Sequence, residues 1–181
     1  MGGVAVYIDT ENAASPDFME QLGLDTKNNF LYVQPGTIEE VFETIERLIG
    51  RLREKAPDKL VCIVWDSVAG TPVKAEVEGD YDPNSRIGLT AKALAKGMRK
   101  VTETLGKEQI AMVFTNQLKT NMAARTPAEA MTTPYFTPGG KAMSYAYSLR
   151  VWLTARKAKA SFIVDDNGYR IGSEVKVKLE K

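Results

Sequence analysis

An unbroken apolar run that ends in an acid and a hydroxyl constrains the fold more than any other stretch. Residues 60–67 read Leu-Val-Cys-Ile-Val-Trp-Asp-Ser and are bounded on both sides by turn-forming residues. Such a run is typical of a strand that is buried on both faces in the middle of a parallel sheet. Asp66 and Ser67 would then emerge at the carboxyl end of the strand, where open α/β sheets bind ligands. A buried strand that ends in a turn cap explains the run equally well.

Composition excludes several classes of function. The 181 residues suffice for one domain with a core, so we expect a single domain over residues 1–181. The absence of histidine excludes serine–histidine catalysis and histidine-ligated zinc. The one cysteine, Cys62, lies inside the apolar run, where we expect it to be buried as a small hydrophobe. With a net charge of +1, any nucleic-acid site has to be local. No apolar stretch is long enough to span a membrane, and we expect a cytoplasmic protein.

Strand and helix signals alternate along most of the chain. Apolar runs predict strands at residues 4–9, 30–34, 60–67, 109–114 and 148–154. Helical spacing and capping residues predict helices at 16–22, from 38 to before Pro57, at 89–105 with Gly106 ending it, and at 141–147. Residues 161–179 read as one hairpin that turns at Asp166-Asn167-Gly168. The order predicts an α/β fold, a mainly parallel sheet flanked by helices with antiparallel C-terminal strands.

Two segments without periodicity read as long loops. Residues 71–87 are acidic and contain glycine, whereas residues 118–138 mix basic, hydroxyl and aromatic side chains. Long loops in compact domains are usually functional or disordered. Single-stranded nucleic acid suits such loops, because its phosphates attract Lys and Arg and its bases stack on side chains.

Three of the predicted strands end in polar residues or are followed directly by them. These residues are Asp9 and Glu11, Asp66 and Ser67, and Asn116 and Gln117. If these strand ends converge, one acid can hold Mg²⁺, a second carboxylate can polarise water, and an amide can sense a phosphate. The pattern therefore indicates a nucleotide hydrolase.

The motifs, taken in order, resemble the RecA family of homologous-recombination strand-exchange ATPases, of the bacterial and phage type. The matching segments lie at residues 7–13, 34–40, 64–69, 74–79, 97–100, 115–119, 137–142 and 172–178. The resemblance implies a RecA-like P-loop NTPase core that uses ATP and Mg²⁺. It also implies single-stranded and double-stranded DNA and other copies of the chain in a filament as partners.

The resemblance assigns roles at the nucleotide. Glu11 is similar to the glutamate that activates the attacking water, and Gln117 to the glutamine that links the γ-phosphate to the second DNA loop. Asp66, with Ser67 beside it, resembles the Walker B aspartate that holds Mg²⁺ through water. Three further positions match nucleotide contacts: Ser15 and Phe18 at the adenine, and Lys181 at the neighbouring subunit's ATP.

The resemblance also assigns DNA contacts and a subunit contact. The first DNA loop covers about residues 78–87 and the second about residues 118–138. The implied DNA-binding residues are Arg86, Ile87, Arg99, Lys119, Arg125, Gly139 and Gly140. Tyr145 falls at an aromatic position of the subunit interface.

One family motif is absent. The sequence contains no Gly-x-x-x-x-Gly-Lys-Ser/Thr phosphate-cradling loop, which in the family precedes the segment that begins at Val4. We therefore expect a truncated core that lacks the P-loop strand, which would lie between the strand ending at Phe114 and the strand near residues 149–153. Without the cradle, ATP affinity should be low and this chain alone inactive.

Three functions fit these features. The first is the core of an ATP-dependent DNA recombinase that forms filaments on single strands and promotes strand exchange in recombination and repair. The alternative is a P-loop-less, RecA-like DNA-binding or regulatory module that does not hydrolyse ATP. A helicase or clock-type ATPase core shares the fold, but the two long loops and the glycine pair after the second favour a recombinase.

Overall fold

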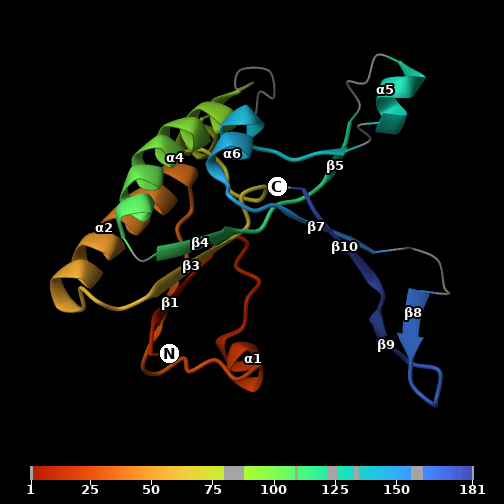
Figure 1. The fold of residues 1–181 in the computed structure, drawn as a ribbon, viewed down its shortest axis with the longest axis horizontal. Coiled ribbons are helices and arrows are strands. Elements are labelled where there is room, and N and C mark those ends of the chain that lie inside the picture. Colours follow the sequence, from red (N-terminus) through yellow and green to blue (C-terminus); the bar gives the residue numbers. More distant parts are fainter. Residues whose placement is uncertain are drawn as a thin grey trace. The chain divides into compact units, whose positions relative to one another are not determined.

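The computed structural model describes residues 2–79, 88–108, 110–121, 126–132, 135–155 and 161–180 (Figure 1). Two compact units divide the chain, Met1–Tyr145 and Ala146–Lys181. In the described residues, no helix is long and apolar enough to cross a membrane.

A four-stranded parallel sheet forms the centre of the first unit. Its strand order is β2 (Phe30–Val33), β1 (Val4–Asp9), β3 (Val61–Asp66) and β4 (Ile110–Phe114). β1 and β3 pair along their whole length, so that Asp9 lies in register with Asp66. All four carboxyl ends meet at one edge, which confirms the predicted parallel sheet.

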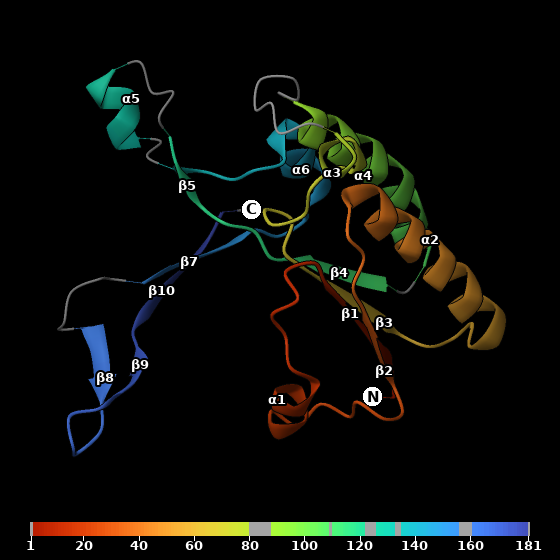
Figure 2. The ribbon, with the colours of Figure 1, turned by 180° about the vertical axis from the view of Figure 1, so that it is seen from behind.

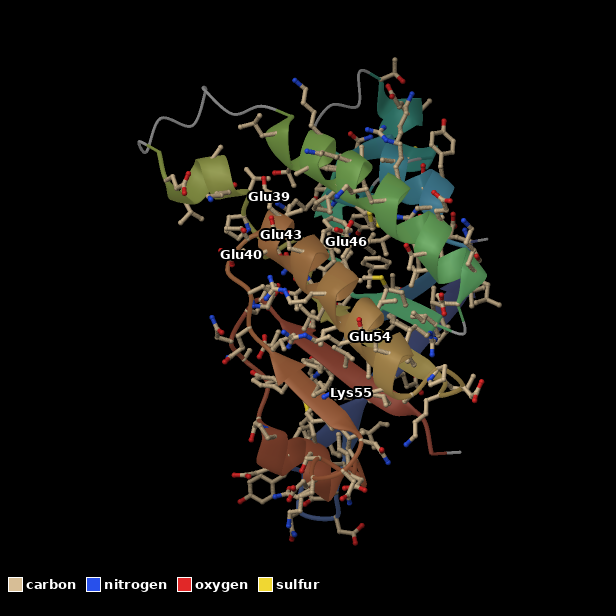
Figure 3. The ribbon with its side chains drawn as sticks, turned by 90° about the vertical axis from the view of Figure 1, so that its left-hand side faces the viewer. Glu39, Glu40, Glu43, Glu46, Glu54 and Lys55 are labelled. Atoms are coloured by element: carbon tan, nitrogen blue, oxygen red, sulfur yellow. The ribbon has the colours of Figure 1, made fainter. Side chains whose placement is uncertain are left out.

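Two long helices, α2 (Ile38–Lys55) and α4 (Leu89–Lys107), lie side by side on one face of this sheet (Figures 1 and 2). The backbone amide of Glu40 donates to Thr37 Oγ1 (3.2 Å) at the start of α2, and the Glu40 carboxylate accepts from the amide of Gly36 (2.7 Å). These contacts satisfy amides that the helix itself leaves unpaired. Many charged residues of α2 line its outward side, as Figure 3 shows for Glu39, Glu40, Glu43, Glu46, Glu54 and Lys55.

Trp65 is the centre of the core between the sheet and the helices. Its side chain is fully buried, and the ring of Phe42 from α2 meets it edge-on with centroids 5.6 Å apart. Its indole Nε1 donates to Thr71 Oγ1 (3.0 Å), so the one polar atom of the side chain is paired. Gly97 on α4 lies directly against the ring of Phe42 and lets the two helices approach closely.

The prediction that β3 is buried on both faces is wrong. Val61, Ile63 and Trp65 point into the core, whereas Cys62 is exposed and Val64 half-buried. The reason is that α2 and α4 both cover the same face of the sheet (Figure 2). On the other face, among the described residues, the apolar side chains of β3 keep contact with solvent.

Several element boundaries also differ from the predictions. The segments expected to be loops contain short elements: α3 (Lys74–Val77), β5 (Lys119–Thr120), α5 (Pro127–Thr132) and β6 (Tyr135–Phe136). α4 continues past Gly106 to Lys107, since an exposed glycine costs a helix only about 1 kcal/mol. The short helices α1 (Pro16–Gln21) and α6 (Gly140–Ala146) lie where capping and spacing predicted them.

The second unit consists of antiparallel strand pairs. β7 (Val151–Ala155) pairs with β10 (Val175–Leu179), and β8 (Phe162–Val164) pairs with β9 (Arg170–Ser173). The predicted second arm of the hairpin is therefore two strands separated by Glu174, whose amide donates to the carbonyl of Ser161 (2.8 Å). The antiparallel C-terminal strands are confirmed. Among described residues, β4 pairs only with β3 and β7 only with β10.

Candidate functional site

The Asp66 carboxylate is the centre of a polar cluster at the carboxyl edge of the sheet. Its Oδ2 accepts a hydrogen bond from the hydroxyl of Tyr7 (2.6 Å), and its Oδ1 accepts one from Thr115 Oγ1 (2.5 Å). Tyr7 comes from β1 and Thr115 follows β4, so residues from both neighbouring strands hold the end of β3. The amide of Thr10 donates to the Asp66 carbonyl (2.8 Å) and ties the chain after β1 to the same point.

Glu11 and Ser67 meet beside Asp66. Ser67 Oγ donates to Glu11 Oε1 and accepts from the amide of Gly70 (3.2 Å). A Cβ at residue 70 would lie 2.8 Å from Glu11 Oε1, so a larger residue there would displace this carboxylate from its present position. The peptide bond between Asp66 and Ser67 is cis. The structure thus brings together the three residues predicted for Mg²⁺ and water, with Glu11 exposed to solvent.

Asp9 has a different environment from the other acids. It is 2% exposed and accepts hydrogen bonds from the Tyr32 hydroxyl (2.6 Å) and the amides of Ala14 (3.0 Å) and Glu11 (3.1 Å). Burial by itself raises the pKa of Asp9, but these hydrogen bonds outweigh burial and lower the pKa below its usual value. Asp9 is therefore a carboxylate that organises the backbone carrying Glu11.

The phenol of Tyr32 gives the folded chain a dependence on alkaline pH. Its hydrogen bond to Asp9, together with burial, raises the pKa of Tyr32 from 10.0 to about 12. A group whose pKa is raised by folding stabilises the folded state below its unfolded-state pKa, and this contribution is lost as the pH rises to the folded-state pKa. We expect the free energy of unfolding, measured with urea, to fall more between pH 10.0 and about 12 for the wild type than for Tyr32→Phe. Equal losses would contradict this prediction.

Gln117, the predicted phosphate sensor, follows β4 and is exposed. The backbone amide of Gln117 donates to Asn116 Oδ1 (2.9 Å), while Asn116 Nδ2 donates to the backbone carbonyl of Pro138 (2.9 Å). The Asn116 side chain therefore joins the residues just before the second predicted DNA loop to the last residue of that loop.

The glycine pair that follows this loop needs to be glycine. Gly139 and Gly140 have φ values of 108° and 68°, in a region that other residues rarely adopt. A Cβ at Gly139 would lie 2.8 Å from Met143 Cγ and 3.1 Å from Leu94 Cδ1, and one at Gly140 would lie 3.2 Å from Ala91 Cβ. The pair therefore packs closely against α4.

Two of the predicted DNA contacts line one surface pocket. The pocket has a volume of about 410 Å³, and Lys119, Gly139, Thr71 and Thr90 are among its lining residues. Arg99 lies on α4, is exposed and does not line this pocket.

The remaining predicted site residues are scattered or lie outside the described part of the chain. Ser15 caps α1, with its Oγ accepting from the amide of Phe18 (3.4 Å), and the Phe18 side chain is 57% exposed. Tyr145 is 79% exposed on α6. Four predicted residues fall outside the described residues: Arg86, Ile87, Arg125 and Lys181. Most of the first predicted DNA loop, residues 80–87, is also outside them.

The oxygen donors at the sheet edge fit Mg²⁺ held through water. Each Asp66 oxygen accepts one hydroxyl hydrogen bond, which leaves lone pairs for metal-bound water. Within the described ranges, no group of three or more acidic, histidine or cysteine side chains could enclose a bare ion. These residues are less suited to hold the phosphates of ATP than a hydrated Mg²⁺ ion, because the sequence has no glycine-rich Lys-Ser or Lys-Thr loop to bind the phosphates.

The hydroxyl groups that surround the acids were not predicted from the sequence. Tyr7, Thr10, Tyr32, Thr71 and Thr115 all donate or accept hydrogen bonds in the cluster. Strand tyrosines and threonines usually read as packing residues. The alternation of side chains along a strand could have revealed Tyr7, because Tyr7 lies two residues before Asp9 and therefore faces the same side of the sheet.

Comparisons with known proteins cover the whole chain. Residues 1–181 match the family model described as the RecA N-terminal domain. Protein RecA from Thermus aquaticus is 35% identical over 180 residues, which are 99% of this chain and 48% of that protein. Protein RecA from Symbiobacterium thermophilum is 34% identical over 181 residues, covering 100% and 47% of the two chains, and Protein RecA from Gloeothece citriformis is 33% identical over 180, covering 99% and 46%.

The strand order and the acids at the sheet edge define an α/β core of the RecA-like type. The chain belongs to the RecA N-terminal domain family, which confirms the resemblance seen in its motifs. It spans about half the length of the curated relatives it matches.

Proposed function

We propose that the chain is part of the ATPase core of a DNA strand-exchange protein. Such a protein binds single-stranded DNA, forms filaments, and promotes homologous pairing and strand exchange in recombination and repair. The observation that carries the proposal is the grouping of Glu11, Ser67 and Asp66 in a chain that the family model matches from residue 1 to residue 181.

Asp66 and Glu11 would have separate roles in ATP hydrolysis. Bound Mg²⁺ supplies charge that neutralises the phosphates. Asp66 would hold metal-bound water through its free lone pairs, and Ser67 orients Glu11 by donating a hydrogen bond to its carboxylate. Glu11 is exposed on the solvent side of the cluster, where its carboxylate can accept a proton from an attacking water. The phosphate cradle would have to come from groups outside these 181 residues.

Lys119 and the glycine pair support DNA binding at the second loop. Lys119 is exposed at the pocket that Gly139 also lines, so its ammonium is available to a phosphate of the backbone. Asn116 holds the end of this loop next to Gln117 and so connects it with the sheet edge that carries the acids. A nucleotide bound at the sheet edge and DNA bound at the loop would therefore contact opposite ends of the same chain segment.

Binding of a fluorescent oligothymidylate, followed by anisotropy at several salt concentrations, tests the proposal. We expect the chain to bind, with an affinity that falls as salt rises, and we expect Lys119→Ala to weaken binding and reduce the salt slope by about 1. Lys55→Ala is the matched control, because Lys55 is also exposed but ends α2, which runs back to the opposite edge of the sheet (Figure 3).

Two results would count against this function. Absence of binding at low salt would contradict it, and equal loss in both lysine variants would show that binding reflects charge alone. The second candidate is a RecA-like DNA-binding or regulatory module that does not hydrolyse ATP. That candidate would be supported if the longest natural protein containing this chain bound single strands and did not hydrolyse ATP.

A further inference from the structure

Two tyrosines make the same diagonal contact on neighbouring strands. Tyr32 on β2 is in register with Tyr7 on β1, and its hydroxyl donates to Asp9, two residues further along β1 (2.6 Å). Tyr7 is in register with Val64 on β3, and its hydroxyl donates to Asp66, two residues further along β3 (2.6 Å). The two rings stack with their centroids 6.3 Å apart and their planes at 11°. We call Tyr7 and Tyr32 the phenol ladder.

The first step of the phenol ladder holds Asp66. Because Tyr7 binds Oδ2 and Thr115 binds Oδ1, rotation of the carboxylate about its Cβ–Cγ bond would break both hydrogen bonds. Thr115 is exposed, whereas Tyr7 is half-buried within the sheet and stacked on Tyr32. Tyr7 is therefore the more firmly placed of the two donors.

The second step holds the segment that carries Glu11. Tyr32 and the amide of Ala14 both donate to Asp9 Oδ2, and the amide of Glu11 donates to Oδ1. Asp9 is thus oriented by the phenol and in turn anchors the backbone on both sides of the turn at Asn12, whose φ is 55°. Displacing Asp9 would move Glu11 relative to Ser67, with which it shares a hydrogen bond.

We propose that Tyr7 and Tyr32 are positioning residues that orient Asp66 and Glu11 toward a hydrated metal ion and the attacking water. The inference rests on the proposed function, because it assigns these two acids to Mg²⁺ and to water. A stack that served packing alone would need only the rings. The two hydroxyl contacts of 2.6 Å, made by the same step on successive strands, each end on a strand-end carboxylate of the cluster.

Tyr7→Phe and Tyr32→Phe remove the hydroxyls and keep the rings. Tyr169→Phe is the matched control, because Tyr169 is 72% exposed in the second unit. We first measure the carboxyl-carbon NMR signals of the aspartates in the metal-free chain, with Asp66→Asn and Asp9→Asn to assign them. Tyr7→Phe should shift the Asp66 signal, Tyr32→Phe should shift the Asp9 signal and the amide signal of Glu11, and Tyr169→Phe should shift neither.

Mn²⁺ binding, followed by electron paramagnetic resonance, then reports the metal side. We expect Tyr7→Phe to weaken Mn²⁺ binding about tenfold, as is usual when a group that orients a metal-binding carboxylate is removed. Circular dichroism of each variant should match the wild type.

The outcomes separate this inference from the proposed function. If Asp66→Asn weakens Mn²⁺ binding and Tyr7→Phe leaves both the affinity and the Asp66 signal unchanged, the phenol ladder has no positioning role and the function of Asp66 stands. If Asp66→Asn does not weaken Mn²⁺ binding, the metal function of Asp66 is wrong and the positioning role falls with it. A shifted Asp66 signal together with weaker Mn²⁺ binding in Tyr7→Phe supports the inference.

Discussion

Gly97→Ala is expected to lower the free energy of unfolding by about 3 kcal/mol, at the upper end of the cost of overfilling a packed core. A Cβ at residue 97 would lie 2.1 Å from both Cδ2 and Cε2 of Phe42 and 2.5 Å from its Cγ. These distances are far inside contact range, so either the ring or the helix has to move. The clash falls in the middle of α4, where it meets α2.

Phe42 has little freedom to move away. Its side chain is 6% exposed, and its ring stands edge-on against Trp65 at 87°. Trp65 itself is fully buried, and its indole is held by Thr71. A displaced Phe42 would therefore disturb the strand that ends in Asp66, and Gly97→Ala should weaken the site as well as the core.

Gly106→Ala is the matched control for this prediction. Gly106 lies in the same helix, and a Cβ there would have no atom within 4 Å. The substitution should therefore raise the free energy of unfolding by about 0.5–1 kcal/mol, through helix propensity alone. Urea unfolding of both variants measures the difference. Equal stability of the two variants would contradict the close contact, and a double variant with Phe42→Leu should recover part of the loss if the clash is with the ring.

Elements whose cause is local could be predicted from the sequence. The strand Val4–Asp9 was predicted with its observed bounds because its apolar run carries its own signal. The caps Ser15 and Thr37 could be read because a side-chain oxygen and the amide three residues later are enough to begin a helix. The grouping of Glu11, Asp66 and Ser67 followed from one geometric fact, that parallel strands bring their carboxyl ends to one edge.

Features that depend on distant partners could not be predicted. The apolar run shows only that Cys62 could be buried. Cys62 is exposed because α2 and α4 both cover the opposite face of the sheet. At Glu174 the pairing changes: β9 before it pairs with β8, whereas β10 after it pairs with β7. Because β7 lies roughly twenty residues earlier in the chain, the local hairpin pattern contains no sign of this change. Tyr7 and Tyr32 look like packing residues until the strand order places each beside the next aspartate.

Glu11→Gln is expected to reduce ATP hydrolysis by about 10²–10⁴-fold, the usual contribution of a general base. The assay needs a phosphate cradle, which can be supplied by fusing a strand and helix with a Gly-x-x-x-x-Gly-Lys-Thr loop ahead of Gly2, in the order that the family resemblance implies. The amide oxygen of glutamine can still accept the hydrogen bond from Ser67, whereas the amide cannot take a proton from water. Phosphate release is the measurement.

Glu11→Gln removes a negative charge as well as a base, so a control has to separate the two losses. Glu54→Gln makes the same change on the outward side of α2 (Figure 3) and should leave hydrolysis unchanged. Single-stranded DNA binding should also persist in Glu11→Gln, because the exposed carboxylate contacts the end of β3 and not Lys119 or Gly139. Hydrolysis by Glu11→Gln at the rate of the unsubstituted fusion would exclude Glu11 as the base. Since Asp9 is buried and already accepts three hydrogen bonds, Glu11 is the better placed of the two acids at the end of β1 to receive the proton.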